Sequence, residues 1–261
     1  MARERERGGD RAGVSRQRVA AYLSQYLAPE RFADYCPNGL QVEGSPRVAV
    51  VASGVTASVA FVRAALRAGA DTLLVHHGWF WRGDDPRVLG PHRERLALVL
   101  GGGLNLFAYH LPLDVHPEVG NNAQLGLRLG WTVDGRFGEE GLGCWHRLPA
   151  PLAVPDLAAR LAQALGREPL VLGPTRRRLR RVAWCTGAAQ GMLAQAAAAG
   201  ADAFISGEVS ERTTHLAREL GITYLAAGHH ATERFGVQAL GERLAADLGV
   251  RHRFIDDPNP V

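Results

Sequence analysis

The sequence predicts an α/β fold in which two similar halves, related by internal duplication, carry mixed or parallel sheets flanked by helices. Short apolar runs that suit strands alternate with longer amphipathic runs that suit helices, which is the rhythm of parallel α/β units. The chain has 261 residues, 46% of them hydrophobic and 31 of them glycine, enough for one large domain or two ordinary ones. The repeat itself is visible, because "AGADTLLVHHG" at 68–78 lines up with "AGADAFISGEV" at 199–209.

The first half reads as alternating helices and strands behind a charged segment at 1–14, which we expect to be disordered. A helix is expected behind Ser15, at 18–27, because Ser is a favoured residue in front of a helix. Strands are expected at 48–54, 72–77 and 104–110, and helices at 56–70 and 92–100. The pattern predicts a first α/β domain over 15–130.

The Gly-rich stretch "WTVDGRFGEEGLGCWHRLP" at 131–149 predicts hairpins or edge strands at a domain junction. Behind it the rhythm returns, with helices expected at 155–165, 189–200, 210–220 and 231–248. Strands are expected at 170–172, 181–187, 202–207 and 222–228. We therefore expect a second α/β domain over 131–261, and its last helix, 231–248, is a candidate to pack on the first domain.

Composition limits the classes of function. The net charge of +4 is concentrated in the N-terminal segment and in "RRRLRR", Arg176 to Arg181. A solvated turn before a strand explains this run better than a phosphate or nucleic-acid site, because no nucleic-acid-binding motif accompanies it. Cys36, Cys144 and Cys185 form no C-x-x-C pair and suit a reducing cytoplasm. No secretory signal, membrane-spanning run, P-loop or nucleophile elbow is recognisable.

Metal-capable side chains follow the ends of several expected strands. His76 and His77 end the strand at 72–77, and Gly78 offers a bend through which both adjacent imidazoles would face one cleft. Taken alone, such a pair is usually a surface or loop feature. Ligand sites in open α/β sheets form at the carboxyl ends of parallel strands, where this pair lies.

Two further motifs, "HLPLD" and "GHHATE", add the candidates His110, Asp114, His229, His230 and Glu233. If a shift of one residue is allowed, "GLNLFAYHLPLD" at 103–114 lines up with "ITYLAAGHHATE" at 222–233, so that His110 matches His229 and Asp114 matches Glu233. Asp114 is expected on a loop stiffened by proline. If a helix begins near His230, His229 and Glu233 lie one turn apart and can face the same ion. Because thiolates are absent from the set, zinc, iron and manganese all remain open.

Five motifs together resemble the GTP cyclohydrolase I type-two-like family, also called the Nif-three-like dinuclear metal-centre proteins. They are "NGLQV", "HHGWFW", "YHLPLDVHPEVGNN", "SGEVSE" and "GHHATE". The resemblance runs from about residue 15 to the C-terminus, in the short bacterial form without a mid-chain insertion. It implies a toroidal homohexamer with two divalent metal ions per subunit. The ligands it implies, with Glu233 bridging, are His76, His77, Asp114, His229 and Glu233.

Other residues have competing interpretations. By the resemblance, His110 and His230 lie behind the ligands or face the substrate. Glu208 occupies the repeat position of His77, so it is either a general base or substrate contact in the cleft, or an acid that favours a helix N-terminus. Asp34, Asn38 and Gln41 lie near the cleft by the resemblance, although Asn38 would also suit a turn. For the aromatic residues Trp79, Phe80, Trp81 and Tyr109, stacking on a base competes with core packing or a subunit interface.

The leading hypothesis is a dinuclear metal-dependent hydrolase, with GTP cyclohydrolase-type ring opening of a guanine nucleotide or similar purine by a metal-bound hydroxide. His110 or His230 would move protons, since an imidazole has the right pKa for that task. One alternative is a ring-forming, metal-binding assembly or regulatory protein that binds a partner or nucleic acid without turnover. Another is a two-metal phosphoesterase, which keeps the site and changes the bond that is cleaved.

Overall fold

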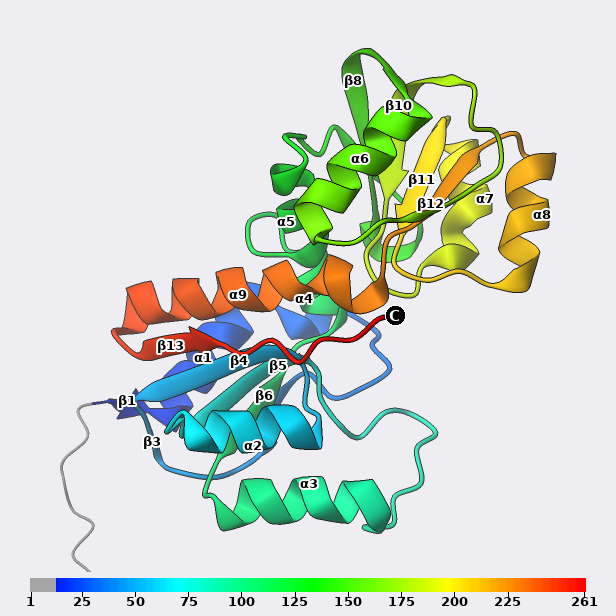
Figure 1. Ribbon diagram of the computed structural model, residues 1–261. Helices are drawn as coiled ribbons and strands as arrows, with labels where there is room; N and C mark the ends of the chain where they lie inside the picture. Colours follow the sequence, from blue (N-terminus) through cyan, green and yellow to red (C-terminus); the bar gives the residue numbers. More distant parts are fainter. Residues whose placement is uncertain (1–12) are drawn as a thin grey trace, which may run out of the picture.

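The protein, described here by a computed structural model over residues 13–261, consists of two α/β halves with one long helix between them (Figure 1). The charged segment expected at 1–14 lies outside the described residues except for its last two, and Val14 already belongs to the short strand β1 (Val14–Ser15). This strand pairs with β3 (Arg47–Val48) in a small antiparallel sheet. No helix among the described residues is long and apolar enough to cross a membrane.

The first half is built on a five-stranded sheet of order β13-β4-β5-β6-β2. Its strands are β2 (Gly39–Val42), β4 (Val50–Thr56), β5 (Thr72–His77), β6 (Asn105–Ala108) and β13 (Arg251–Phe254). All run parallel to their neighbours except β2, which pairs antiparallel with β6. The sheet is therefore formed largely by residues 39–108, and the end of the chain returns to pair along β4.

Helices cover both faces of this sheet. They are α1 (Arg16–Leu27), α2 (Val59–Arg67), α3 (Gly90–Gly101) and α9 (His229–Leu248). Side chains alternate along a strand, so Val51 and Leu74 pack with α1 and α9 on one face, whereas Ala52 and Leu73 pack with α2 and α3 on the other. As expected, Ser15 caps α1: its hydroxyl accepts a hydrogen bond from the amide of Arg18.

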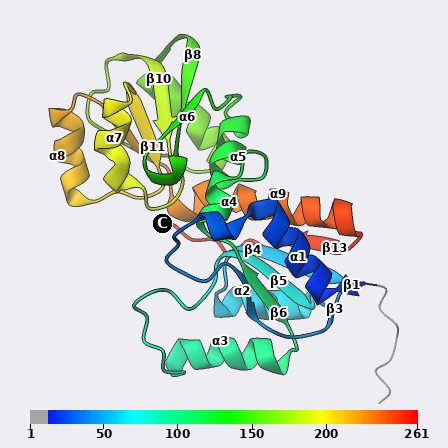
Figure 2. The same cartoon turned by 180° about the vertical axis from the view of Figure 1, so that it is seen from behind.

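The connection between the halves consists of two short helices, α4 (Leu111–Val115) and α5 (Asn121–Arg128). Seen from behind, they lead from the end of β6 towards the second half (Figure 2). Asp114 therefore lies in a helical turn, and the expectation of a loop at this point is wrong. Pro112 occupies the first turn of α4, where its missing amide hydrogen costs no helical hydrogen bond.

The second half has a six-stranded sheet of order β7-β8-β10-β11-β12-β9. Its strands are β7 (Gly135–Phe137), β8 (Gly143–Ala153), β9 (Leu170–Leu172), β10 (Arg178–Trp184), β11 (Ala203–Ser206) and β12 (Thr223–Ala226). Its helices are α6 (Val154–Leu165), α7 (Leu193–Ala198) and α8 (Glu211–Glu219), with 3-10 turns at Pro29–Arg31, Glu139–Gly141 and Gln190–Met192 along the chain. The Gly-rich stretch forms the antiparallel β7-β8 hairpin, with β7 at the sheet edge as expected.

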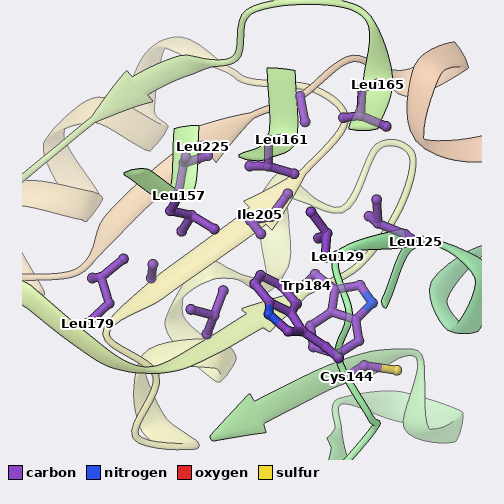
Figure 3. Packing of buried hydrophobic residues seen from close by; sticks show 14 of the residues in the cluster. Leu125, Leu129, Cys144, Leu157, Leu161, Leu165, Leu179, Trp184, Ile205 and Leu225 are labelled. Carbon is purple, nitrogen blue, oxygen red and sulfur yellow. The ribbon is translucent and has the colours of Figure 1, made fainter. Parts of the chain in front are cut away.

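One core of the second half lies between α6 and the sheet (Figure 3), and a second lies on the other face with α7 and α8. Leu157, Leu161 and Leu165 recur at intervals of four along α6 and pack over Ile205 and Leu225 of the central strands. The start of α9 reaches the same core through Ala231 and Phe235. Because α9 also covers the first sheet, it joins the two halves.

The duplication is present in the register of the sheets. Val51 lies opposite Thr72, which lies opposite Asn105 in the first half. In the second half, Val182 lies opposite Ala203 in the same way, and Ala203 lies opposite Thr223. The repeated three-strand unit is thus β4-β5-β6 and β10-β11-β12. A division into domains 15–130 and 131–261 stays a proposal, and the return of α9 and β13 to the first sheet shows that the C-terminal segment packs with the first half.

Candidate metal centre

The expected ligands come together where the carboxyl ends of both parallel units face each other. His76 and His77 end β5, Asp114 lies in α4, and His229 and Glu233 lie in the first turns of α9. The helix begins at His229 itself, which places Glu233 one turn away on the same face. Segments that are more than one hundred residues apart in sequence thus meet in one cluster.

Glu233 lies at the centre of this cluster. Its Oε1 is 3.5 Å from Nε2 of His76, and its Oε2 is 3.2 Å from Nε2 of His77 and 3.0 Å from Nε2 of His229. Ligating atoms form two groups, each within 4.8 Å, that share this carboxylate: His76, Asp114 and Glu233, and His77, His229 and Glu233. One carboxylate thus lies in both groups, which is the arrangement expected for a bridge between two ions.

Hydrogen bonds at Nδ1 hold each of the three histidines with Nε2 towards Glu233. His76 Nδ1 is 2.9 Å from the carbonyl of Tyr109, and His77 Nδ1 is 3.1 Å from the hydroxyl of Thr56. His229 Nδ1 is 2.7 Å from the Glu208 carboxylate. A histidine that donates through Nδ1 keeps a lone pair on Nε2, which is how metal-ligating imidazoles are usually oriented.

The charge balance of the cluster requires a cation or protons. Oε2 of Glu233 is buried and has no hydrogen-bond donor among the described residues, although two imidazole nitrogens lie close to it. An anionic oxygen facing lone pairs is stable only if positive charge lies between them. Imidazole and carboxylate donors suit divalent zinc, iron or manganese, so the residues present fit such ions.

The pKa values show the same competition for positive charge. Burial would lower the pKa of His76, but the Asp114 and Glu233 carboxylates outweigh it and raise that pKa to about 10. Burial likewise opposes the charge of His229, whose pKa is nevertheless raised to about 9 by Glu233 and Glu208. Despite its burial, Glu233 has a pKa held well below its usual range by His76 and His77. Divalent ions would replace these protons on binding.

Asn121 fixes the orientation of Asp114. Its amide nitrogen donates to Oδ1 of Asp114 at 2.9 Å, and its carbonyl oxygen accepts from the amide of Gly236 at 3.0 Å. The side chain is fully buried, and this pair of bonds ties α5 to α4 and to α9. This residue was not among the expected site residues, although the "NN" that ends the motif "YHLPLDVHPEVGNN" was a signal that could have found it.

Asp34 and Asn38 form a second polar network beside the cluster. Asp34 Oδ1 is 2.7 Å from Nδ1 of His110, and its Oδ2 accepts from Asn38 at 2.8 Å and from the amide of Leu111 at 2.9 Å. Burial opposes the Asp34 charge, but the hydrogen bonds from His110 and Asn38 lower the pKa of its carboxyl to about 2. Asn38 accepts from the amide of His110, so it does more than form a turn.

The tentative catalytic residues occupy different places. His110 lies with His76 and His77 in a third group of ligating atoms within 4.8 Å. Glu208 contacts His229 as described. His230 points away from Glu233, because its Nε2 is 2.9 Å from Asp256, and it lines a separate cavity of about 170 Å³ beside His77 and His229.

Gly78 acts through its small size. Its φ is not positive, and a Cβ there would clash with Oε1 of Gln41, whose amide group bonds both to the amide and to the carbonyl of Trp79. Gln41 therefore fixes the segment behind the two histidines. Among the aromatic residues, Trp79 and Tyr109 are buried in the core, whereas the ring of Trp81 lies 5.0 Å from that of His110.

A cavity of about 370 Å³ opens beside the cluster between the two halves. His110, Asp114, His229 and Glu233 lie at one side of it, and its other walls include Tyr35, Leu142, Thr186 and Met192. The size is within the range of small-molecule sites. The arginine run lies elsewhere: Arg177 pairs with Asp202, and Arg181 donates to the carbonyl of Ala199.

The fold and this cluster define a class of protein: a duplicated α/β chain with a candidate metal centre at the carboxyl ends of both parallel units. The model of the Duf34/NIF3 (NGG1p interacting factor 3) family matches residues 14–260, so the chain belongs to this family. A relative from Pseudomonas aeruginosa named "GTP cyclohydrolase 1 type 2 homolog" is 53% identical over 240 residues, which are 91% of this chain and 95% of that protein.

Other relatives agree. The Escherichia coli K12 protein of the same name is 49% identical over 240 residues, covering 92% of this chain and 96% of its own length. The solved structure titled "protein ybgI, unknown function" has a TM-score of 0.90 and 47% identity, with 95% of this chain and 100% of that chain covered. A solved structure from Thermus thermophilus gives a TM-score of 0.85 at 38% identity, with the same coverage. The family resemblance seen in the sequence motifs is confirmed.

Proposed function

We propose that this chain is a dinuclear metal-dependent hydrolase whose ions are held by His76, Asp114 and Glu233 on one side and by His77, His229 and Glu233 on the other. The observation that supports this most directly is the Glu233 carboxylate, which lies in both groups and has an oxygen without a donor among the described residues. Two neighbouring divalent ions activate water and polarise the bond under attack. The metal could be zinc, iron or manganese.

The chain's own residues would bind and orient the substrate. The cavity beside the cluster gives access to it from the side of His110, and Trp81 provides an aromatic face next to that histidine. His110 is better placed than His230 to move a proton to or from a substrate, because the ring of His230 is turned to Asp256. Glu208 orients His229 in this account, which makes a general-base role unnecessary.

For the substrate we propose a guanine nucleotide or a similar purine compound, opened in the manner of a GTP cyclohydrolase. The name of the relatives with about 50% identity, GTP cyclohydrolase 1 type 2 homolog, supports this class. The test is release of formate from GTP by the metal-loaded protein, with Glu233→Gln as the inactive control. Release of phosphate in place of formate would identify a two-metal phosphoesterase, and no turnover of GTP would contradict the cyclohydrolase assignment.

A second candidate function is a metal-carrying assembly or regulatory protein without turnover. The family description names an interacting factor, which favours this class. In either case we propose a toroidal homohexamer in the cytoplasm, and the mass of the native particle in solution tests the assembly. Arg177 pairs with Asp202 and Arg181 with the carbonyl of Ala199, both within this chain, so these arginines give little support to nucleic-acid binding. DNA binding with a steep salt dependence and no turnover would favour the alternative.

A further inference from the structure

We propose that His110, held by Asp34, is an additional metal ligand, and that His76, His77 and His110 form an alternative position for a single divalent ion at the cavity. This inference rests on the proposed metal-binding function and adds a ligand to it. The three histidines would supply the protein ligands of one ion when the pair of positions around Glu233 is not filled.

The first argument is that the three rings gather around one point. Their ring centres are 4.5 Å apart for His76 and His77, 5.1 Å for His76 and His110, and 5.9 Å for His77 and His110. One ring nitrogen of each lies within 4.8 Å of those of the other two. Three imidazoles with room for a further ligand are a common set for zinc and related borderline ions.

The second argument is that all three rings are oriented in the same way. Nδ1 of His76 meets a backbone carbonyl, Nδ1 of His77 meets a hydroxyl, and Nδ1 of His110 meets the Asp34 carboxylate at 2.7 Å. Each ring can therefore donate through Nδ1 and keep Nε2 for an ion. A carboxylate behind a histidine is the usual partner of a metal-ligating imidazole, because it fixes the tautomer and makes the ring a stronger donor.

The third argument comes from the duplication. His110 and His229 follow the matched strands β6 and β12, and each has a carboxylate 2.7 Å from Nδ1, from Asp34 and Glu208 respectively. The two histidines are thus supported in the same way. The three histidines differ in how accessible they are to solvent. The side chain of His76 is fully buried, whereas those of His77 and His110 are 18% and 16% exposed. An ion entering from the cavity would meet His110 at its wall, where Asp114 and Glu233 also lie.

The experiment measures bound metal in a Glu233→Gln background, which weakens the positions that share the carboxylate. Each purified variant is titrated with Co²⁺, whose absorption bands report coordination by nitrogen, and metal per chain is counted after dialysis. We expect Glu233→Gln to retain one ion. Adding His110→Ala should lower the affinity for that ion at least about 10-fold. Adding Asp34→Asn should lower the affinity by about 10- to 100-fold, the range typical for such supporting groups.

His230→Ala in the same background is the matched control, because His230 faces Asp256 and lies in none of the groups of ligating atoms found among the described residues. It should leave the single ion in place. Circular dichroism of each variant separates loss of metal from loss of fold, and His110→Gln replaces His110→Ala if the latter unfolds. Equal affinity with and without His110, or no ion in Glu233→Gln, would overturn the inference while leaving the dinuclear site intact. A native chain that binds no divalent ion would overturn both.

Discussion

The two halves repeat the same three strands but contribute differently at their carboxyl ends. The first half presents His76 and His77 at the end of β5, whereas the matched positions behind β11 are Gly207 and Glu208. Gly207 gives space: a Cβ there would lie 2.6 Å from Cα of His229 and 2.7 Å from the carbonyl of Gly187. One copy of the repeat thus carries two of the proposed ligands, where the other makes room for the helix that carries His229 and Glu233.

This difference shows how a duplicated fold can build one asymmetric site. A histidine follows each of the matched strands β6 and β12, with a carboxylate behind it. The segments that follow these histidines differ: β12 leads directly into the long helix α9, whereas β6 leads into the short helix α4. The acids Asp114 and Glu233 follow their histidines at the same spacing, yet only Glu233 reaches both groups of ligands.

The largest expected effect is a difference in metal content between variants of the two matched histidines, His229 and His110. His229→Ala removes a proposed ligand of the second ion, so we expect the metal content to fall from the proposed two ions per chain to about one. His110→Ala should leave both ions in place, because the positions around Glu233 do not depend on it. Metal analysis of the two purified variants makes the comparison. Equal losses in both variants would show that the two histidines contribute equally to the filled site.

The next largest effect is expected on stability at Gly207, where there is no room for a side chain. Gly207→Ala places a methyl group against the backbone of His229 and Gly187, and this overpacking should cost about 1–3 kcal/mol in the free energy of unfolding. Gly191→Ala is the control, since no atom lies within 4 Å of its Cβ position, and a change within about 0.5 kcal/mol is expected. Urea denaturation measures both. A neutral Gly207→Ala would mean that α9 can shift without cost.

A smaller effect is expected at Glu208. Glu208→Ala leaves Nδ1 of His229 without its carboxylate, and removal of such a partner typically weakens metal binding by about 10- to 100-fold. Glu208→Gln keeps an acceptor oxygen at this position and should restore most of the affinity. Competition with a chelator of known affinity measures both variants. If the Ala and Gln variants bind metal equally well, Glu208 does not position His229.

The parts of the site that follow a strand or lie on one helical turn were predictable from the sequence. Gly228 and the double histidine mark the end of β12, and the spacing of His229 and Glu233 implies one helical face. Asp34 was placed only by resemblance, because it lies in an irregular segment whose position depends on hydrogen bonds to His110 and Leu111. Asn121 was missed, since its role comes from tertiary contacts of α5 with Asp114 in α4 and with Gly236 in α9.

The fold was predictable to a similar degree. Apolar runs identified the buried parallel strands, because such strands need hydrophobic residues on both faces. The edge strands β2 and β13 were missed: "RHRF" at Arg251–Phe254 has too few apolar residues to be recognised, and β2 follows an Asn-Gly pair that reads as a turn. Both strands are defined by pairing with a neighbour that is far away in sequence, β13 with β4 and β2 with β6.

The central claim is that Glu233 joins two ions into one site, and metal content tests it most directly. The native protein, purified without added metal or a histidine tag, is compared with Glu233→Gln by plasma mass spectrometry. The account predicts about two divalent ions per native chain and about one in the variant, with the fold unchanged by circular dichroism. Absence of metal from the native protein, even after reconstitution with zinc, iron and manganese, would contradict it.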